Sequence, residues 1–418
     1  MEIKRDSLLN NLMSLRHNGM IKVITGMRRC GKSYLLFNLF PNALKSEGVD
    51  EQHIIKVNLE DRRNKILRDP DKLLEYIDGK LKDNDMYYVL LDEVQMVREF
   101  EDVLNSYLHV KNADVYVTGS NARFLSKDVI TEFRGRGYEV RVHPLSFREI
   151  RGARPEVPIE QLWVDYMTYG GLPQVVTMDS DKERSTYLKG LFKHTYLKDI
   201  KERHDIKLDD DLEELIGTLA STIGGLTNPR KLADTFHSIK KSKISQDTIK
   251  VYLDYLQDAF IIERALRYDI KGKRYIDTPS KFYFEDLGLR NALLNFRQVE
   301  KTHLMENAIY NTLRSRGMDV DVGEVIWNTK DNYGKKIRKT LEVDFVCNLG
   351  SRRYYLQSAY RLPDEEKMLQ EKRSLQQIND SFKKIVVVGE RMKLRRDDFG
   401  IVLMGIFEFL DDSQLIDQ

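Results

Sequence analysis

Short runs of apolar residues alternate with amphipathic stretches over the first 152 residues. Continuous apolar runs are typical of buried strands, and apolar residues spaced three or four apart are typical of helices. Because strands that alternate with helices build parallel sheets, we expect residues 1–152 to form a parallel sheet flanked by helices. The apolar runs predict strands at residues 21–24, 53–59, 87–91, 114–119 and 138–142.

The pattern changes after a polar segment with two prolines, residues 151–158, which has the composition of a linker. Residues 159–206 follow a helical pattern that is broken at Gly170-Gly171-Leu172-Pro173. This region predicts a small helical lid.

Residues 207–276 contain three amphipathic helical segments followed by two strand-like runs around a basic turn. Ser245 is well placed as the N-cap of the third helix. Three short helices and a two-stranded wing predict a winged helix-turn-helix. Its positive side chains, Lys240, Lys241, Lys243, Lys250, Lys271, Lys273 and Arg274, would give one face a charge suited to DNA phosphates. The DNA contacts predicted from this face are Lys250, Lys271, Lys273 and Arg274, and a winged helix used only for packing or protein contact explains the pattern equally well.

A phosphate-binding motif lies between the first predicted strand and the helix after it. Gly26 and Gly31 permit close backbone approaches, and the loop amides, together with the helix N-terminus, offer donors to phosphate oxygens. Lys32 would bind the β- and γ-phosphates, and Ser33 would offer its hydroxyl to Mg²⁺. The pattern G-x-x-x-x-G-K-[ST] is matched by Gly26, Met27, Arg28, Arg29, Cys30, Gly31, Lys32 and Ser33. The sequence therefore predicts binding of ATP with Mg²⁺.

Two carboxylates end the buried strand at 87–91 and indicate hydrolysis. Asp92 stands where it can hold the Mg²⁺ shell opposite Ser33, and Glu93 stands where it can polarise a water in line with the γ-phosphate. On the next strand tip, Asn121 can reach between the γ-phosphate and that water. Arg136, in a Gly-Arg-Gly turn, could complete the site of a neighbouring subunit, and a solvated basic loop explains it equally well.

These motifs together resemble the prokaryotic AAA-type ATPases that carry a DUF4143 C-terminal region. The residues that carry the resemblance are Gly26–Ser33, Leu90–Gln95, Thr118–Asn121, Gly135-Arg136, Pro144–Glu149, Tyr169–Pro173 and Lys281–Asn291. The resemblance implies an AAA+ core with Walker A and Walker B motifs, a sensor-1 residue at Asn121 and an arginine-finger candidate at Arg136. It implies no agreed cellular role.

Residues 281–410 again mix helix and strand patterns, and their order resembles the PD-(D/E)xK nuclease core. In an active nuclease the acidic residues collect a divalent metal, and a lysine polarises the attacking water. Glu306 and Asp344 match the first two positions, but Gln357 replaces a carboxylate and Ala359 replaces the lysine. We therefore expect a degenerate, nuclease-derived domain with at most a vestigial site.

Composition and charge limit the classes of partner. The 418 residues are 41% hydrophobic and 32% charged, with a formal net charge of +2, so any DNA contact needs a local basic patch. The two cysteines, one of them in the phosphate loop, favour a reducing compartment over a structural disulfide. No apolar run is long enough to cross a bilayer. We expect a cytoplasmic protein with no membrane partner.

The leading interpretation is an α/β protein: an AAA+ P-loop ATPase core (1–152), a helical lid (159–206), a winged helix-turn-helix (207–276) and a degenerate PD-(D/E)xK-like domain (281–410). ATP hydrolysis would serve a DNA- or protein-binding event in the C-terminal half, and a homo-oligomer would allow an arginine finger to act in trans. One alternative is a slow nucleotide-gated binding switch. A second is an ATPase-driven nuclease.

Overall fold

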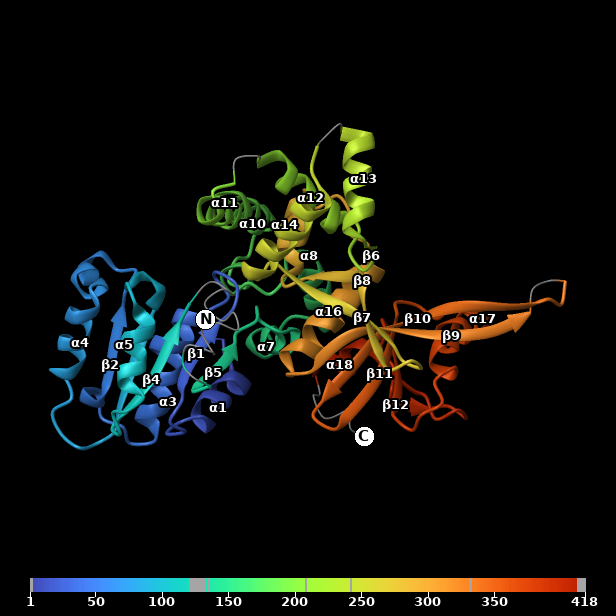
Figure 1. The fold of residues 1–418 in the computed structure, drawn as a ribbon. Helices are drawn as coiled ribbons and strands as arrows, with labels where there is room; N and C mark the ends of the chain where they lie inside the picture. The colour runs from blue at the N-terminus through green and yellow to red at the C-terminus, as the bar shows by residue number, and fades with distance from the viewer. Residues whose placement is uncertain are drawn as a thin grey trace. The chain divides into compact units, whose positions relative to one another are not determined.

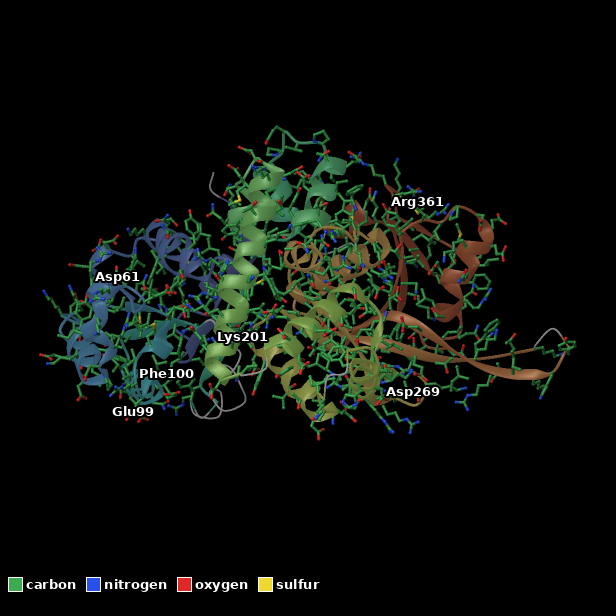
Figure 2. The ribbon with its side chains drawn as sticks, turned by 90° about the horizontal axis from the view of Figure 1, so that it is seen from above. Asp61, Glu99, Phe100, Lys201, Asp269 and Arg361 are labelled. Atoms are coloured by element: carbon green, nitrogen blue, oxygen red, sulfur yellow. The ribbon has the colours of Figure 1, made fainter. Side chains whose placement is uncertain are left out.

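The computed structural model describes residues 3–119, 133, 135–206, 209–240, 243–330 and 333–411. The chain forms two compact units, shown as a ribbon in Figure 1 and with side chains in Figure 2. Unit 1 runs to Pro144 and includes residues 172–174 and 258–260, and unit 2 comprises the remainder. Within the described residues, no helix is both long and apolar enough to cross a membrane.

Unit 1 is an α/β unit built on a five-stranded sheet in the order β2-β3-β4-β1-β5, with every neighbouring pair parallel. Its strands are β1 Ile21–Thr25, β2 Ile54–Asn58, β3 Tyr87–Asp92, β4 Ala113–Thr118 and β5 Gly137–Arg141. Its helical elements are α1 Asp6–Ser14, α2 Lys32–Tyr34, η1 Leu35–Leu39, α3 Phe40–Ser46, η2 Glu51–His53, η3 Arg62–Arg68, α4 Pro70–Asp78, η4 Val94–Met96 and α5 Phe100–Tyr107. The parallel sheet predicted from the apolar runs is confirmed.

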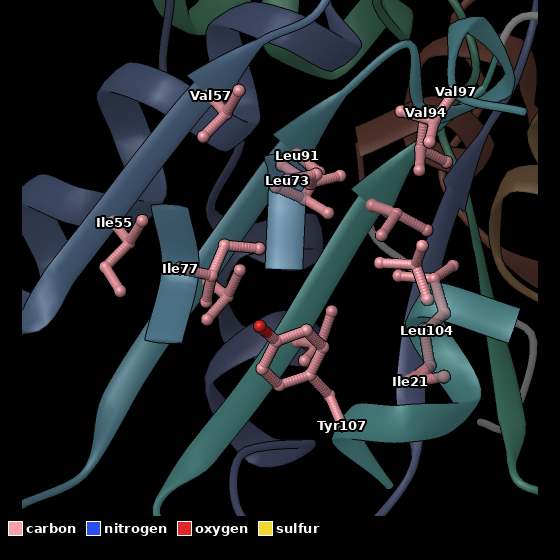
Figure 3. Packing of buried hydrophobic residues seen from close by; sticks show 14 of the residues in the cluster. Ile21, Ile55, Val57, Leu73, Ile77, Leu91, Val94, Val97, Leu104 and Tyr107 are labelled. Atoms are coloured by element: carbon pink, nitrogen blue, oxygen red, sulfur yellow. The ribbon is translucent and has the colours of Figure 1, made fainter. Parts of the chain in front are cut away.

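The sheet of unit 1 is held by an apolar core between its strands and helices α4 and α5. Leu91 of β3, with both of its neighbours along the strand, is buried, as expected for a parallel strand covered on both faces. Figure 3 shows Leu73 and Ile77 of α4 and Leu104 of α5 packed over the strands. This packing holds the carboxyl ends of β1, β3 and β4 side by side.

Unit 2 combines helices with a mixed nine-stranded sheet. Its chain region contains α7 Phe147–Ala153, α8 Ile159–Tyr169, α9 Pro173–Val176, α10 Asp181–Leu191, η6 Phe192–Leu197, α11 Lys198–His204, α12 Asp209–Ser221, α13 Pro229–Lys240, α14 Gln246–Asp258, α15 Leu287–Leu293, α16 Lys301–Ser315, α17 Glu365–Gln376 and α18 Ile406–Asp411. The helical pattern predicted over residues 159–206 is found, with its break at Gly170.

The nine strands of unit 2 lie in the order β13-β14-β12-β11-β10-β9-β7-β8-β6. Their bounds are β6 Leu226–Thr227, β7 Ile262–Asp269, β8 Arg274–Phe284, β9 Asp319–Lys330, β10 Lys336–Leu349, β11 Arg352–Ala359, β12 Lys383–Val388, β13 Arg395–Arg396 and β14 Val402–Gly405. From α16 onward the chain runs helix, three strands, helix and strand. The helix with Glu306 and the strands with Asp344 and Gln357 form as predicted, whereas β9 and α17 were not predicted.

The predicted wing differs from the observed hairpin. The three helices α12, α13 and α14 form, and β7 and β8 follow them as an antiparallel pair. However, β7 also pairs with β9 and β8 with β6, so the hairpin lies inside the nine-stranded sheet. Part of the backbone that a free wing would expose, at residues 267–269 of β7 and 280–281 of β8, pairs with other strands of this sheet. The winged-helix assignment is therefore not confirmed.

Two motifs that are far apart in the sequence meet in unit 2. The Asp286 carboxylate accepts a hydrogen bond from the Gly171 amide at 2.7 Å, and the Asn291 side chain donates to the carbonyls of Met167 and Thr168 at 2.8 and 2.9 Å. A Cβ at Gly170 would lie 2.3 Å from Asp286 Oδ2, which explains glycine there. These contacts join the end of α8 to the start of α15.

Candidate nucleotide site

The phosphate-binding loop follows β1 and turns through backbone conformations that few residues accept. Gly26, Arg29 and Gly31 have φ angles of 136°, 67° and 104°. A Cβ at Gly26 would lie 2.0 Å from the carbonyl oxygen of Val142, so only glycine fits there. The resulting loop carries successive amides into the start of α2, which is the arrangement of an anion-binding nest.

Lys32 is buried at the centre of this loop, with 5% of its surface exposed. Its ammonium donates to the carbonyl oxygens of Gly26 and Met27, both at 3.0 Å. These bonds hold the cation inside the turn of the loop. A positive charge is thus positioned against the same backbone amides that would bind phosphate.

The start of α2 and the carboxyl ends of β3 and β4 bring three oxygen-bearing side chains together. Ser33 Oγ donates to Asp92 Oδ1 at 3.1 Å, and Thr118 Oγ1 donates to the same oxygen at 2.5 Å. Burial raises the pKa of Asp92, and the two hydroxyl donors act in the opposite direction. A hydroxyl beside a carboxylate is the hard-oxygen donor set that Mg²⁺ prefers, so the residues present fit this ion.

Glu93 follows Asp92 in a left-handed conformation, with φ of 55°, which turns its backbone out of β3. Its amide donates to Thr118 Oγ1 at 2.9 Å, so Thr118 contacts both acidic residues of the motif. The Glu93 carboxylate is half-buried and accepts a hydrogen bond from the side chain of Gln95. The sequence analysis missed Thr118, although its place at the end of a buried strand was a signal.

A second residue missed from the sequence is Arg5, which binds the loop from outside. Its guanidinium donates to the carbonyl of Cys30 at 3.1 Å and to that of His143 at 2.9 Å. The thiol of Cys30 is fully buried and donates to the carbonyl of Val142 at 3.2 Å. Arg5 therefore ties the loop to the segment after β5. No local sequence pattern around Arg5 indicates this role.

The two remaining predicted residues of the site have different outcomes. Asn121 lies outside the described residues. Arg136 is exposed at the amino end of β5, where its carbonyl accepts from Ile21 at the start of β1. The phosphate-binding loop follows the carboxyl end of β1, so Arg136 and this loop lie at opposite ends of the parallel strands. Arg136 does not contribute to the site of its own chain.

Comparisons with known proteins agree with this geometry. Residues 18–151 match the model of an AAA domain (AAA_14), and residues 160–300 match a domain of unknown function, DUF8612. An uncharacterised protein of Haemophilus influenzae is 31% identical over 413 residues, which are 98% of both chains. The chain belongs to this family of AAA-domain proteins. It is also 28% identical over 360 residues to the uncharacterised protein MJ1544 of Methanocaldococcus jannaschii, covering 83% of this chain and 76% of the relative.

Among solved structures, the fold of this chain is similar to that of a Walker-type ATPase of Pyrococcus abyssi. The TM-score is 0.51 at 16% identity, over 70% of this chain and 96% of that one. This likeness concerns the fold alone. The matched C-terminal model is DUF8612, so the DUF4143 region expected from the sequence is not confirmed.

The predicted vestigial nuclease residues of this AAA-family chain cluster around a lysine that the sequence analysis did not assign to them. Lys281 of β8 is buried, and its ammonium lies 2.9 Å from Glu306 Oε1 and 2.7 Å from Glu342 Oε1. Tyr283 also donates to Glu306 Oε1, at 2.7 Å. Burial opposes ionisation of Glu306, but the Lys281 cation and the side chains that hydrogen-bond to the carboxylate together outweigh it and lower the pKa of Glu306 to about 2.

Asp344 lies beside this cluster and binds the backbone of the next strand. Its Oδ2 accepts from the Ser358 amide at 2.7 Å, and its own amide donates to Gln357 Oε1 at 3.4 Å. Burial and the neighbouring Glu306 carboxylate hold the pKa of Asp344 well above its ordinary value. Glu306, Asp344 and Gln357 are therefore brought together as predicted. However, the Lys281 ammonium already forms ion pairs with Glu306 and Glu342.

The predicted DNA-contact residues lie on two elements of unit 2. Lys250 is exposed on α14, with its ammonium 3.3 Å from Asp247 Oδ1. Lys271, Lys273 and Arg274 are exposed at the turn between β7 and β8. Lys243 is described and exposed, whereas the side chains of Lys240 and Lys241 lie outside the described part.

Proposed function

We propose that this protein is a Mg²⁺-dependent ATPase whose nucleotide state controls a binding event in its C-terminal half. One observation carries the proposal: Ser33, Asp92 and Glu93 converge at the carboxyl edge of the parallel sheet, beside the loop that holds Lys32. Ligands of open α/β sheets bind at this edge. The AAA-domain match over residues 18–151 supports the same reaction.

Each residue of the site has a defined task in this proposal. The amides of the loop bind and orient the phosphates, and Lys32 neutralises their charge. Ser33 and Asp92 would hold Mg²⁺, which when bound would neutralise charge that develops on the phosphates. Glu93 accepts the proton of the attacking water at its carboxylate. Asn121 is proposed to orient that water.

The test compares the parent with Glu93→Gln, which keeps the side-chain shape but removes the base. We expect unchanged ATP affinity by calorimetry and a turnover at least about 100-fold lower, the usual contribution of a general base. Glu75→Gln, on exposed α4 surface, is the matched control and should turn over ATP like the parent. Parent-like turnover by Glu93→Gln would refute the assignment of the base.

The slow-switch alternative is distinguished by how turnover depends on protein concentration. An arginine finger acting between subunits makes turnover per subunit rise with concentration, because the finger arrives with the neighbour. Arg136 is exposed at the end of the strands opposite the phosphate-binding loop of its own chain, where it could act only on a neighbouring subunit. Flat turnover across a dilution series would favour the switch.

The nuclease alternative is not favoured by the acidic cluster. A divalent metal would have to displace Lys281 from Glu306 and Glu342, and Gln357 and Ala359 still lack the charges of an active centre. The expected result is no nicking of supercoiled plasmid with Mg²⁺ or Mn²⁺. Nicking that Asp344→Ala abolishes would establish the nuclease instead.

A further inference from the structure

Strands β9 and β10 continue beyond the nine-stranded sheet as a two-stranded ribbon. Among the described residues, β9 pairs with β7 only as far as Glu324, and β10 pairs with β11 only from Phe345 onward. Between these points the two strands pair with each other alone, and Figure 1 shows them projecting from unit 2. We call residues 325–341 the arm. At 3.4 Å per residue, its paired part is about 17 Å long.

The arm is strongly basic, although the whole chain is nearly neutral. Its sequence holds one acidic residue, Asp331, which lies outside the described part. Its five basic residues are Lys330, Lys335, Lys336, Arg338 and Lys339, all of them exposed. An excess of four positive charges on one ribbon contrasts with the net charge of +2 on all 418 residues.

The register assigns these charges to the two faces of the arm. Lys336 is opposite Lys330, and Arg338 is opposite Asn328, so these four side chains share one face. The other face carries Trp327, whose ring is 4.9 Å from the Arg373 guanidinium of α17. The Trp327 face is therefore directed toward α17, and the face with Lys330, Lys336 and Arg338 points away from it.

The acidic residues at the base of the arm are already paired. Glu324 forms an ion pair with Arg267, and Glu342 lies 2.7 Å from Lys281. Beside this base lies the exposed turn after Asp269, the residue of β7 opposite Glu324 (Figure 2). That turn carries Lys271, among the other basic residues predicted to contact DNA. The turn therefore adds exposed basic residues beside the base of the arm.

The basic face contains a like-charge contact that costs stability. Lys330 and Lys336 are direct cross-strand partners, and like charges placed opposite each other destabilise a ribbon. Lysines also protect exposed strand edges from aggregation, but that role does not require two of them to face each other. A polyanion that lies along this face would remove the repulsion.

We propose that the arm is a DNA-binding ribbon that places Lys330, Lys336 and Arg338 against the phosphates of a B-form duplex. The major groove of B-DNA is about 12 Å wide and admits a two-stranded ribbon. The major groove of an RNA duplex is narrow and deep, so a ribbon of this width fits DNA better. This inference names the partner within the proposed function, but DNA binding itself does not depend on ATP hydrolysis.

The test measures binding of the full chain to a fluorescent DNA duplex by anisotropy, without nucleotide, at several salt concentrations. The arm variant is Lys330→Ala/Lys336→Ala/Arg338→Ala. We expect it to bind at least about tenfold more weakly and its salt slope to fall by about 2.7, since each lost phosphate contact removes about 0.9. Exposed substitutions of this kind change folding stability little.

The matched control removes three exposed cations from unit 1, in Lys65→Ala/Lys80→Ala/Lys111→Ala. It makes the same change in net charge and should bind DNA like the parent. Equal losses in both variants, or none in the arm variant, would overturn the proposal. Tighter parent binding to an RNA duplex or to polyglutamate than to DNA would overturn the choice of partner. ATP turnover measured on the same samples separates this result from the ATPase assignment.

Discussion

Thr118 and Asp92 face each other across the carboxyl ends of β4 and β3, with the Thr118 hydroxyl 2.5 Å from Asp92 Oδ1. The same hydroxyl accepts the amide of Glu93 at 2.9 Å. One buried side chain therefore orients the proposed magnesium carboxylate and the backbone of the proposed base. A hydrogen bond to a metal-ligating side chain from a neighbouring residue fixes the orientation of that side chain and commonly changes metal affinity.

Thr118→Val keeps the shape of this side chain but removes its hydroxyl. We expect a lower turnover and a higher Mg²⁺ concentration for half-maximal activity, by about 10- to 100-fold, because Asp92 loses a donor that orients it. Activity titrated with Mg²⁺ measures this. Thr118→Ser retains the hydroxyl and should recover most of the Mg²⁺ response. A Thr118→Val protein with the parent Mg²⁺ requirement would argue against a positioning role.

Arg136 offers a test of action between subunits. Because it lies at the edge of the sheet opposite its own loop, removal of its charge can affect hydrolysis only through a neighbouring chain. In Arg136→Ala we expect turnover per subunit to be low and independent of protein concentration, with ATP affinity unchanged. Lys80→Ala, which removes another exposed cation, should behave like the parent. If dilution affects Arg136→Ala as it affects the parent, the finger lies elsewhere.

Lys281 forms ion pairs with Glu306 and Glu342 inside unit 2, so its loss should destabilise the fold. Lys281→Met leaves Glu306 buried without its cation, and breaking a buried pair costs about 3–5 kcal/mol. Urea unfolding followed by circular dichroism gives this free energy. Lys301→Met, at an exposed position of α16, should change it by less than about 0.5 kcal/mol. A loss below about 1 kcal/mol in Lys281→Met would show that solvent compensates the carboxylates.

Asp286 makes stability depend on pH, because burial raises its pKa to about 6 from an ordinary value of 3.8. The folded chain holds this proton more tightly than the unfolded chain, so the stabilisation is complete below about pH 4 and is lost as pH rises to about 6. Asp286→Asn removes the titration. We expect the free energy of unfolding of the parent, relative to that of the variant, to fall by roughly 3 kcal/mol from pH 4 to pH 7. A constant gap would contradict the shift.

Much of unit 1 could be predicted from the sequence, because its strands and its phosphate-binding loop are defined by neighbouring residues. A buried parallel strand reads as a continuous apolar run, as residues 87–91 show, and the loop from Gly26 to Ser33 is defined by residue types at fixed spacing. Thr118 and Arg5 were missed because their roles depend on partners 26 and 25 residues away, with no periodic signal between them. Such contacts exist only after the strands and the loop have taken their places.

In unit 2, local patterns predicted the helix that carries Glu306 and the strands that carry Asp344 and Gln357, and these elements do form. Pairing between distant strands decided the rest. It placed β7 and β8 inside a nine-stranded sheet. It also brought Lys281 to the carboxylate of Glu306, in a cluster where position 359, the expected lysine, is alanine. The sequence alone determined the phosphate-binding loop and the class of fold, since both depend on neighbouring residues. Which charges meet, and which face of the arm they share, was decided by the tertiary structure, because strand register is set by the whole sheet.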